Sequence, residues 1–384
     1  MPWRQRLKSR LARGGSKSTL RYVALAFVLS RAVVYLAFFL APLFIPESRA
    51  APGVQSDLPR FIDAGLRWDY RWYSSIVNHG YHLPGTGEEA NVAFWPLYPL
   101  LVKSAAALTA QDIGLMGIIV SNAAFLVAIY YLYRLVALGY SKELASRTVL
   151  YLSFFPTSFF FSAFYSDAIL LLGVSAAFYH QIRGEGMRAG IFGAAAALTH
   201  PSGALLALPM AVEALRNEGG RRLLGVFLVV LGSLAFPIYL YFRLGTPLAF
   251  TSAASGGSWA HTWAWPWDTL GQALNLALTD PWIDTGFLLS AVVTIGLIAI
   301  TVVALRTQRL SFSLWALALL ALYLSLPPRI PLDSMSRYAL VFFPCFITLA
   351  NWGGKRIINL SILAVFLPLL ILLSAMFSRW FWVA

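Results

Sequence analysis

The sequence predicts an all-α polytopic membrane protein with about eleven transmembrane helices. Hydrophobic residues make up 59% of the 384 positions and charged residues only 12%, about half of the 25% that is usual in soluble proteins. The mean hydropathy is +0.70. One crossing needs about 20 apolar residues, so eleven crossings would use roughly 220 positions, which this composition can supply. A soluble globular protein is therefore excluded.

The N-terminal region combines a basic segment with a long apolar run. Seven Lys and Arg residues lie within residues 1–21, directly before the apolar run 22–45. That run is longer than the core of a cleaved signal peptide, so we expect a retained first helix whose N-terminus is cytoplasmic. We thus expect a basic cytoplasmic tail (1–21) and a single integral-membrane domain (22–384).

Further apolar runs follow along the chain. They are 113–138, 149–164, 166–182, 189–215, 223–242, 285–305, 311–326, 337–351 and 357–377. The run 189–215 has basic residues at both ends, so a single crossing would export one of two basic loops. Two shorter helices that meet at His200-Pro201-Ser202-Gly203 keep both loops inside, because proline and glycine interrupt helices. This split gives eleven crossings, with the C-terminus outside.

The charge distribution agrees with this topology. The formal net charge of +13 divides into +15 on the cytoplasmic side, −3 on the outer side and +1 within the membrane, from Arg31. The basic excess therefore orients the chain in the membrane and does not indicate a nucleic-acid surface. Because Arg31 lies inside the first helix, it must face protein or a wet cavity, and we expect it to form a structural ion pair.

Two long outer loops, 46–112 and 243–284, are expected to carry functional residues. In the first loop, residues 62–77 read as an amphipathic helix at about 100° per residue, with Asp69 in the middle of its apolar face. Burial would raise the pKa of Asp69 toward neutrality, which suits a general base. Two alternatives give the same pattern without catalysis: a helix broken at Gly65, or a buried aspartate that caps a helix or pairs with an arginine from elsewhere.

Motifs of the first loop resemble those of a known family. The segments are Trp68-Asp69-Tyr70-Arg71-Trp72-Tyr73, His79-Gly80-Tyr81 and Ala93-Phe94-Trp95-Pro96-Leu97-Tyr98-Pro99. They are similar to the first-loop signature of the PIG-V family, which comprises the second mannosyltransferase of GPI-anchor synthesis and its prokaryotic relatives. This family belongs to the C-type superfamily of membrane glycosyltransferases. Weaker matches follow in the same order at 164–168, 200–203, 245–250 and 336–340. His200 and Asp167 depart from the family pattern, which often has Arg and Glu there.

The resemblance implies a C-type glycosyltransferase fold with its active site on the outer side. The enzyme would transfer a sugar, expected to be mannose, from a polyprenyl or dolichyl phosphate to a lipid or glycan acceptor, with inversion. Asp69 would be the general base, and Asp167 would either assist it or cap the following helix. Asp333 is an alternative, local ion-pair partner for Arg337. Candidate ligands of the donor phosphate are Arg337, Arg329, Arg71 and His200. Candidate residues for binding the acceptor and the sugar are Trp68, Trp72, Tyr73, His79 and Trp95.

No metal cofactor is expected. His79 and His82 are spaced to share a metal, but no Cys, Asp or Glu follows at a matching spacing. The expected partners are membrane lipid, the polyprenyl-phosphate sugar and a glycolipid or glycan acceptor, in a prokaryotic cell membrane or, in a eukaryote, the endoplasmic reticulum membrane.

The sequence is also compatible with three other functions. A related transferase could use another sugar or a protein acceptor. A transporter would also have broken helices and intramembrane charges, but it should place its charges near the midplane, whereas this chain gathers them at the outer face. A structural subunit would not need Asp69 among apolar residues.

Overall fold

The computed structural model describes residues 17–49, 57–83, 90–216, 220–256, 259–281, 283 and 285–384. Every regular element in these ranges is a helix, which confirms the all-α prediction. Residues 1–16 of the predicted basic tail lie outside the described residues.

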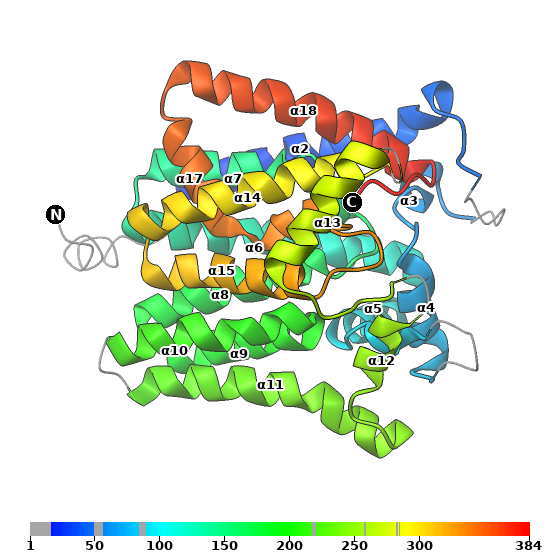
Figure 1. Ribbon diagram of the computed structural model, residues 1–384, viewed down its shortest axis with the longest axis horizontal. Helices are drawn as coiled ribbons and strands as arrows, with labels where there is room; N and C mark the ends of the chain where they lie inside the picture. The colour runs from blue at the N-terminus through cyan, green and yellow to red at the C-terminus, as the bar shows by residue number, and fades with distance from the viewer. Residues whose placement is uncertain are drawn as a thin grey trace.

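Long helices with roughly parallel axes form the body of the protein (Figure 1). Helices lie over all the predicted apolar runs. They are α2 (Lys17–Phe44), α6 (Ile113–Gly139), α7 (Lys142–Ser153), η2 (Ser158–Ser162), α8 (Asp167–Arg183), α9 (Gly186–Thr199), η3 (Pro201–Leu206), α10 (Ala207–Arg216), α11 (Gly220–Leu244), α14 (Phe287–Thr307), α15 (Leu310–Ser325), η4 (Ala339–Val341), α17 (Phe343–Trp352) and α18 (Arg356–Ser378). Among the described residues, five of the helices are long and apolar enough to cross a membrane. The number of eleven crossings stays a prediction.

Close helix packing in the bundle depends on small residues. Helix α8 is buried along almost its whole length, and its Gly173 faces Ala196 of α9 so closely that a Cβ there would lie 2.8 Å from the alanine Cβ. Gly232 of α11 meets Ala194 of α9 in the same way, at 2.8 Å from its Cα. Small residues at such crossings let backbones approach and gain van der Waals contact, which is the main force between helices in lipid.

The predicted interruption at His200 is a break between α9 and α10. Helix α9 ends at Thr199, His200 is extended (φ −158°, ψ 144°), and η3 then leads into α10. Gly203 in η3 packs directly on the backbone of Ala196 and Ala197. The chain can reverse here because proline begins the 3-10 turn and glycine allows this close approach.

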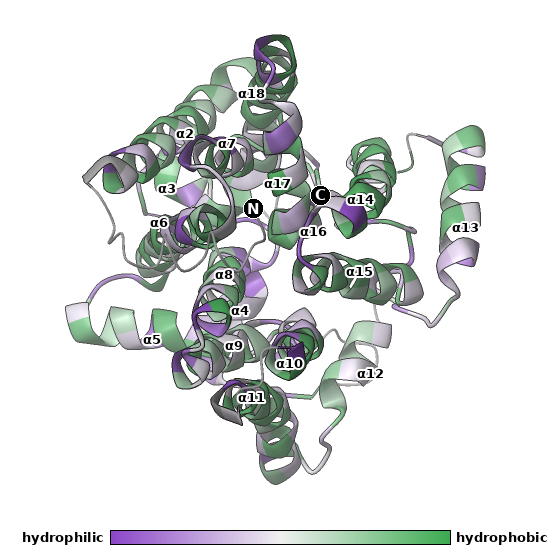
Figure 2. Cartoon of the chain, turned by 90° about the vertical axis from the view of Figure 1, so that its left-hand side faces the viewer, coloured by the Kyte–Doolittle hydropathy of each residue, from purple (hydrophilic) through white to green (hydrophobic). Residues whose placement is uncertain are grey.

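Shorter helices lie in the two predicted outer loops and directly before η4, and several of them gather at one end of the bundle (Figure 1). They are α3 (Arg60–Asp63), α4 (Tyr70–His79), η1 (Asn91–Ala93), α5 (Leu97–Thr109), α12 (Ala249–Ser255), α13 (Pro266–Thr279) and α16 (Met335–Tyr338). Figure 2 looks along the bundle and shows α5 and α13 side-on, so both helices cross the bundle axis.

The prediction of one continuous helix over 62–77 is wrong. The carbonyl of Gly65 accepts a hydrogen bond from the Phe164 N–H (3.0 Å). This carbonyl therefore does not take part in the hydrogen bonding of a continuous helix. Trp68 then adopts a left-handed backbone (φ 52°), and α4 begins only at Tyr70. The helical wheel therefore does not apply across the break, and Asp69 is the residue that leads into α4.

Arg31 is buried in α2 but forms no ion pair among the described residues. Its guanidinium donates to the Ser158 carbonyl (2.8 Å), the Ser153 carbonyl (3.1 Å) and the hydroxyls of Ser158 and Ser162 (3.0 Å each). Neutral oxygens thus replace the expected counter-ion. Through these bonds, Arg31 of α2 holds the end of α7 and the 3-10 helix η2 in place. The chain continues from η2 into α8.

Replacement of Gly203 by alanine should destabilise the protein. The new Cβ would lie 2.2 Å from the Ala196 carbonyl oxygen, a backbone atom that cannot move without distorting α9. We expect Gly203→Ala to lower the free energy of unfolding by about 2 to 3 kcal/mol, measured by SDS denaturation in mixed micelles. Gly296→Ala in α14, where a Cβ would meet nothing within 4 Å, is the matched control. Equal stabilities of the two variants would contradict the close contact between Gly203 and the backbone of α9.

Candidate active site

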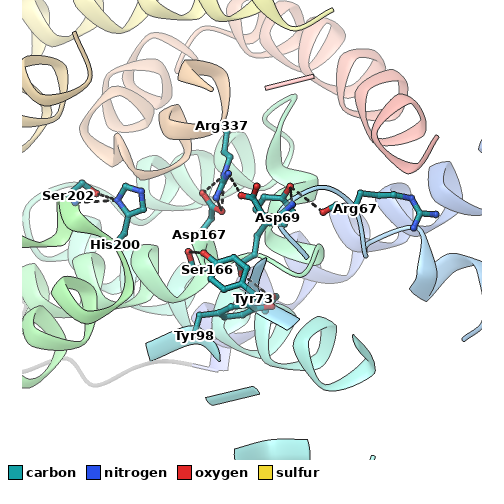
Figure 3. Close-up of polar contacts among 11 residues, drawn as sticks. Arg67, Asp69, Tyr73, Tyr98, Ser166, Asp167, His200, Ser202 and Arg337 are labelled. Atoms are coloured by element: carbon teal, nitrogen blue, oxygen red, sulfur yellow. Dashed lines mark hydrogen bonds and ion pairs between the residues drawn. The ribbon is translucent and has the colours of Figure 1, made fainter. Parts of the chain in front are cut away.

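Two carboxylates and one guanidinium from distant parts of the chain meet where α4, α8 and α16 come together (Figure 3). Asp69 precedes α4, Asp167 begins α8, and Arg337 lies in α16. Nη1 of Arg337 donates to Oδ2 of Asp69 at 2.8 Å. Its Nε donates to both oxygens of Asp167 at 3.1 and 3.2 Å, and its Nη2 lies 3.0 Å from Oδ2 of Asp167. All three guanidinium nitrogens are therefore engaged.

The cluster is withdrawn from solvent. The side chains of Asp69, Asp167 and Arg337 are 14%, 8% and 9% exposed. Buried charges are tolerated only when they are paired and hydrogen-bonded, so each carboxylate depends on the arginine. With one cation for two carboxylates, the fully ionised cluster carries one net negative charge. The alternative pairing of Arg337 with Asp333 does not occur, and Asp333 instead accepts a hydrogen bond from Nε1 of Trp382 (2.7 Å).

Burial dominates the protonation equilibrium of Asp69. It raises the pKa of this carboxyl above its ordinary value of 3.8, and the nearby charge of Asp167 raises the pKa further, while the charge and hydrogen bond of Arg337 oppose this shift. A carboxylate with a raised pKa is a stronger base than a solvent-exposed aspartate.

Tyr165 supports both sides of the Asp69–Arg337 pair. Its ring centroid lies 4.4 Å from Cζ of Arg337, and its hydroxyl accepts the backbone N–H of Asp69 (3.3 Å) while donating to the Arg67 carbonyl (3.4 Å). Sequence reasoning gave this tyrosine no role. The only signal for it was its place in the motif Phe164-Tyr165-Ser166-Asp167-Ala168.

Further hydrogen bonds hold the segments that carry the charged groups. Tyr73 on α4 donates through its hydroxyl to Ser166, next to Asp167 (2.8 Å). Thr157 donates to the Ser336 carbonyl, next to Arg337 (2.7 Å). Each of these bonds joins residues that are far apart in the chain, so they fix the helix ends relative to one another.

The backbone is strained on both sides of the cluster. Trp68, directly before Asp69, has φ 52°, and Leu332 and Ser334, shortly before Arg337, both have φ 67°. Left-handed backbone is uncommon for residues other than glycine and persists only where surrounding contacts impose it. This strain indicates that the positions of Asp69 and Arg337 are set by tertiary packing.

His200, another predicted phosphate ligand, lies near the cluster. Its ring centroid lies 6.2 Å from that of Tyr338, the residue after Arg337. Its Nδ1 accepts the backbone N–H of Ser202 (3.2 Å) and contacts the Ser202 hydroxyl (2.8 Å). The imidazole is thereby held in a fixed orientation at the break between α9 and α10.

Two predicted phosphate ligands and one predicted acceptor residue are exposed. Arg329 lies in the segment before α16. The guanidinium of Arg71 lies 4.5 Å from the Trp72 ring centroid. His79 is the last residue of α4. Arg329 and His79 take no part in the Asp69–Arg337–Asp167 cluster, whereas the charge of Arg71 acts on Asp69 and lowers its pKa.

The predicted aromatic ligands fall into separate groups. Trp68 packs edge-on against Trp380 and Trp382. Trp72 lies against Phe94 and Trp259, with ring centroids 6.0 and 5.4 Å away. Trp95 is buried between Phe236 and Phe250, and Tyr73 is buried in α4. Of these side chains, only that of Tyr73 is linked to the cluster by a hydrogen bond, through Ser166.

Within the described ranges, no three His, Cys, Asp or Glu side chains are grouped so that they could hold a metal ion. Both carboxylates of the cluster already bind Arg337. The absence of a metal cofactor stays a prediction.

Comparison with known proteins gives a family and a fold. A family model described as Mannosyltransferase (PIG-V) matches residues 19–213, half of the chain, including Asp69 and Asp167. The crystal structure of ArnT from Cupriavidus metallidurans bound to undecaprenyl phosphate is similar, with a TM-score of 0.54 and 15% sequence identity over 90% of this chain and 63% of that chain. The Archaeoglobus fulgidus oligosaccharyltransferase in complex with Zn and sulfate has a TM-score of 0.48 and 12% identity over 94% of this chain and 53% of that chain. The chain thus spans less than two thirds of either structure. A search of curated proteins found no match.

Replacement of Arg337 should destabilise the protein much more than replacement of an exposed arginine. Arg337→Gln would leave two buried carboxylates facing each other, and we expect the free energy of unfolding to fall by about 3 kcal/mol. The exposed Arg329→Gln is the matched control and should change it by less than about 0.5 kcal/mol. SDS denaturation followed by tryptophan fluorescence measures both. If Arg337→Gln is as stable as its control, the cluster does not bear on stability.

Proposed function

Because the chain belongs to the PIG-V mannosyltransferase family and has a C-type glycosyltransferase fold, we propose that it transfers mannose from a polyprenyl phosphate to a lipid or glycan acceptor, with inversion. Membership in this family makes the protein a membrane glycosyltransferase. ArnT, with the similar fold, is described as bound to undecaprenyl phosphate, which supports a polyprenyl-phosphate donor. The predicted topology puts the reaction on the extracytoplasmic side, and we expect no metal requirement.

The observation that carries this proposal is the buried cluster of Asp69, Asp167 and Arg337. Inverting transfer in one step needs a base for the acceptor hydroxyl proton, and Asp69 is a desolvated carboxylate with a raised pKa. The hydroxyl oxygen attacks the anomeric carbon of mannose, its proton passes to Asp69, and the bond between the anomeric carbon and the phosphate oxygen breaks. The polyprenyl phosphate leaves with the electron pair of that bond.

Arg337 has two functions in this mechanism. Through Nε and Nη2 it holds Asp167, and through Nη1 it holds Asp69. We place the donor phosphate beside Nη1, where it competes with Asp69 for the guanidinium. Arrival of the donor then frees the Asp69 carboxylate to accept a proton, while the bond to Asp167 keeps the arginine in place. The net negative charge of the cluster also favours the oxocarbenium-like transition state of glycosyl transfer.

The base assignment is tested by Asp69→Asn. Purified protein in nanodiscs would receive polyprenyl-phosphate mannose with radiolabelled sugar and a lipid extract as acceptor. We expect the variant to lose at least about 100-fold in transfer rate, because proton transfer to a positioned base contributes about 10² to 10⁴-fold. Asp268→Asn, at an exposed aspartate of α13, should remain as active as wild type. Transfer by Asp69→Asn at the wild-type rate would exclude Asp69 as the base, and absence of transfer by wild type would exclude the proposed reaction.

The pH profile provides a separate test. Asp69 acts in its deprotonated form, so kcat/KM should fall as the pH drops through its pKa, which burial raises above 3.8. Asp167 contributes to that increase, so Asp167→Asn should move the acidic limb of the profile to lower pH. The measurement is kcat/KM between about pH 4 and 8 for both proteins. A limb that stays in place or moves to higher pH would contradict the coupling of the two carboxylates.

A further inference from the structure

A cavity away from the ionic cluster lies between the outer-loop helices α4 and α5 and the bundle helices α9 and α11. Its volume is about 330 Å³, which is within the range of small-molecule sites. None of the residues predicted to bind the sugar donor or the acceptor lines it. The function proposed above therefore does not account for this cavity.

The walls of the cavity suit a hydrocarbon chain. Apolar side chains come from each of the neighbouring helices, among them Ile76, Val77, Leu100, Leu198, Ala235 and Phe236. Lys103 of α5 is the only charged side chain among the described residues of the lining, and it is exposed. A single cation next to an apolar cavity matches a molecule with an apolar chain and one anionic group.

The location of α5 places this cavity at a membrane boundary. Figure 2 shows α5 projecting from the side of the bundle, across its axis. Leu100, Leu101 and Leu108 are 56%, 41% and 87% exposed. A helix that lies across a membrane bundle and exposes leucines on its surface is typical of the interface between lipid headgroups and acyl chains. At that level the ammonium group of Lys103 can reach a lipid phosphate.

We propose that this cavity is a binding site for an anionic phospholipid of the surrounding bilayer, with one acyl chain between α4 and α11 and the phosphate paired with Lys103. The site is distinct from the reaction centre. Val77 lies eight residues beyond Asp69, about 12 Å further along α4, so a lipid held here leaves the ionic cluster free. The bound chain fills the space between an outer-loop helix and a membrane-spanning helix, and thereby supports the helix that follows Asp69.

The experiment is a lipid titration read by native mass spectrometry. The full-length protein in a mild detergent would be titrated with dioleoyl phosphatidylglycerol and, separately, with dioleoyl phosphatidylcholine. We expect the first phosphatidylglycerol to bind about fivefold more tightly than phosphatidylcholine, which corresponds to about 1 kcal/mol for one lysine. Lys103→Gln should abolish this preference without changing phosphatidylcholine binding. Lys142→Gln, at an exposed lysine that begins α7, is the matched control and should keep it.

A second variant tests the cavity itself. Ala235→Trp puts a large ring into the cavity, and we expect it to weaken binding of both lipids at least fivefold. Glycerophosphoglycerol, the same headgroup without chains, should not compete if the acyl chain contributes as proposed. The proposal is overturned if Lys103→Gln keeps the preference for phosphatidylglycerol, or if the headgroup alone displaces the lipid. Lys103→Gln changes an exposed side chain, so it decides the outcome even if Ala235→Trp fails to fold. Because the readout is lipid binding, its result is independent of whether the protein transfers mannose.

Discussion

The ion pairs of Arg337 with Asp69 and Asp167 are the interaction on which the arrangement of the candidate site depends. A single guanidinium joins the first outer loop, the beginning of α8 and the short helix α16. Each of the three charges would be costly to bury alone, and their pairing offsets that cost only when its geometry is good. The surrounding structure supplies that geometry through hydrogen bonds from Tyr165, Tyr73 and Thr157. The strained backbone at Trp68 and Ser334 is a cost that these contacts offset.

The same cluster gives Asp69 the properties that the proposed mechanism requires of a base. A carboxylate in water would be a weak base, whereas an unpaired buried one would be protonated permanently. Asp69 lies between these limits because burial raises its pKa and Arg337 opposes that increase. In the proposed mechanism, Asp69 therefore responds to any anion that binds Arg337, including the donor phosphate. The ionic cluster thus joins three segments of the chain, and in the proposed mechanism it also makes proton acceptance by Asp69 depend on the binding of the donor.

Residue patterns predicted the elements of the fold better than they predicted its contacts. Apolar runs located the bundle helices, and Pro201 with Gly203 revealed the break between α9 and α10, because these are local properties of the chain. The helical wheel placed Asp69 on a buried face of a continuous helix, but the helix is interrupted and the burial comes from tertiary packing. The partner of Asp69 could not be predicted, since Arg337 lies 268 residues away and local charge made Asp333 the simpler partner. The partners of Arg31 could not be predicted either, because backbone carbonyls accept its hydrogen bonds and every residue has a carbonyl.

The separation of the ionic partners has a consequence for biosynthesis. The family match ends at residue 213, and Arg337 follows Asp167 by 170 residues. At about 5 to 20 residues per second, the ribosome needs roughly 10 to 35 seconds to add that stretch. During this interval both acids are already part of the nascent chain, but their cation does not yet exist. The carboxyls of Asp69 and Asp167 must therefore stay hydrated, or stay protonated, until translation has supplied Arg337.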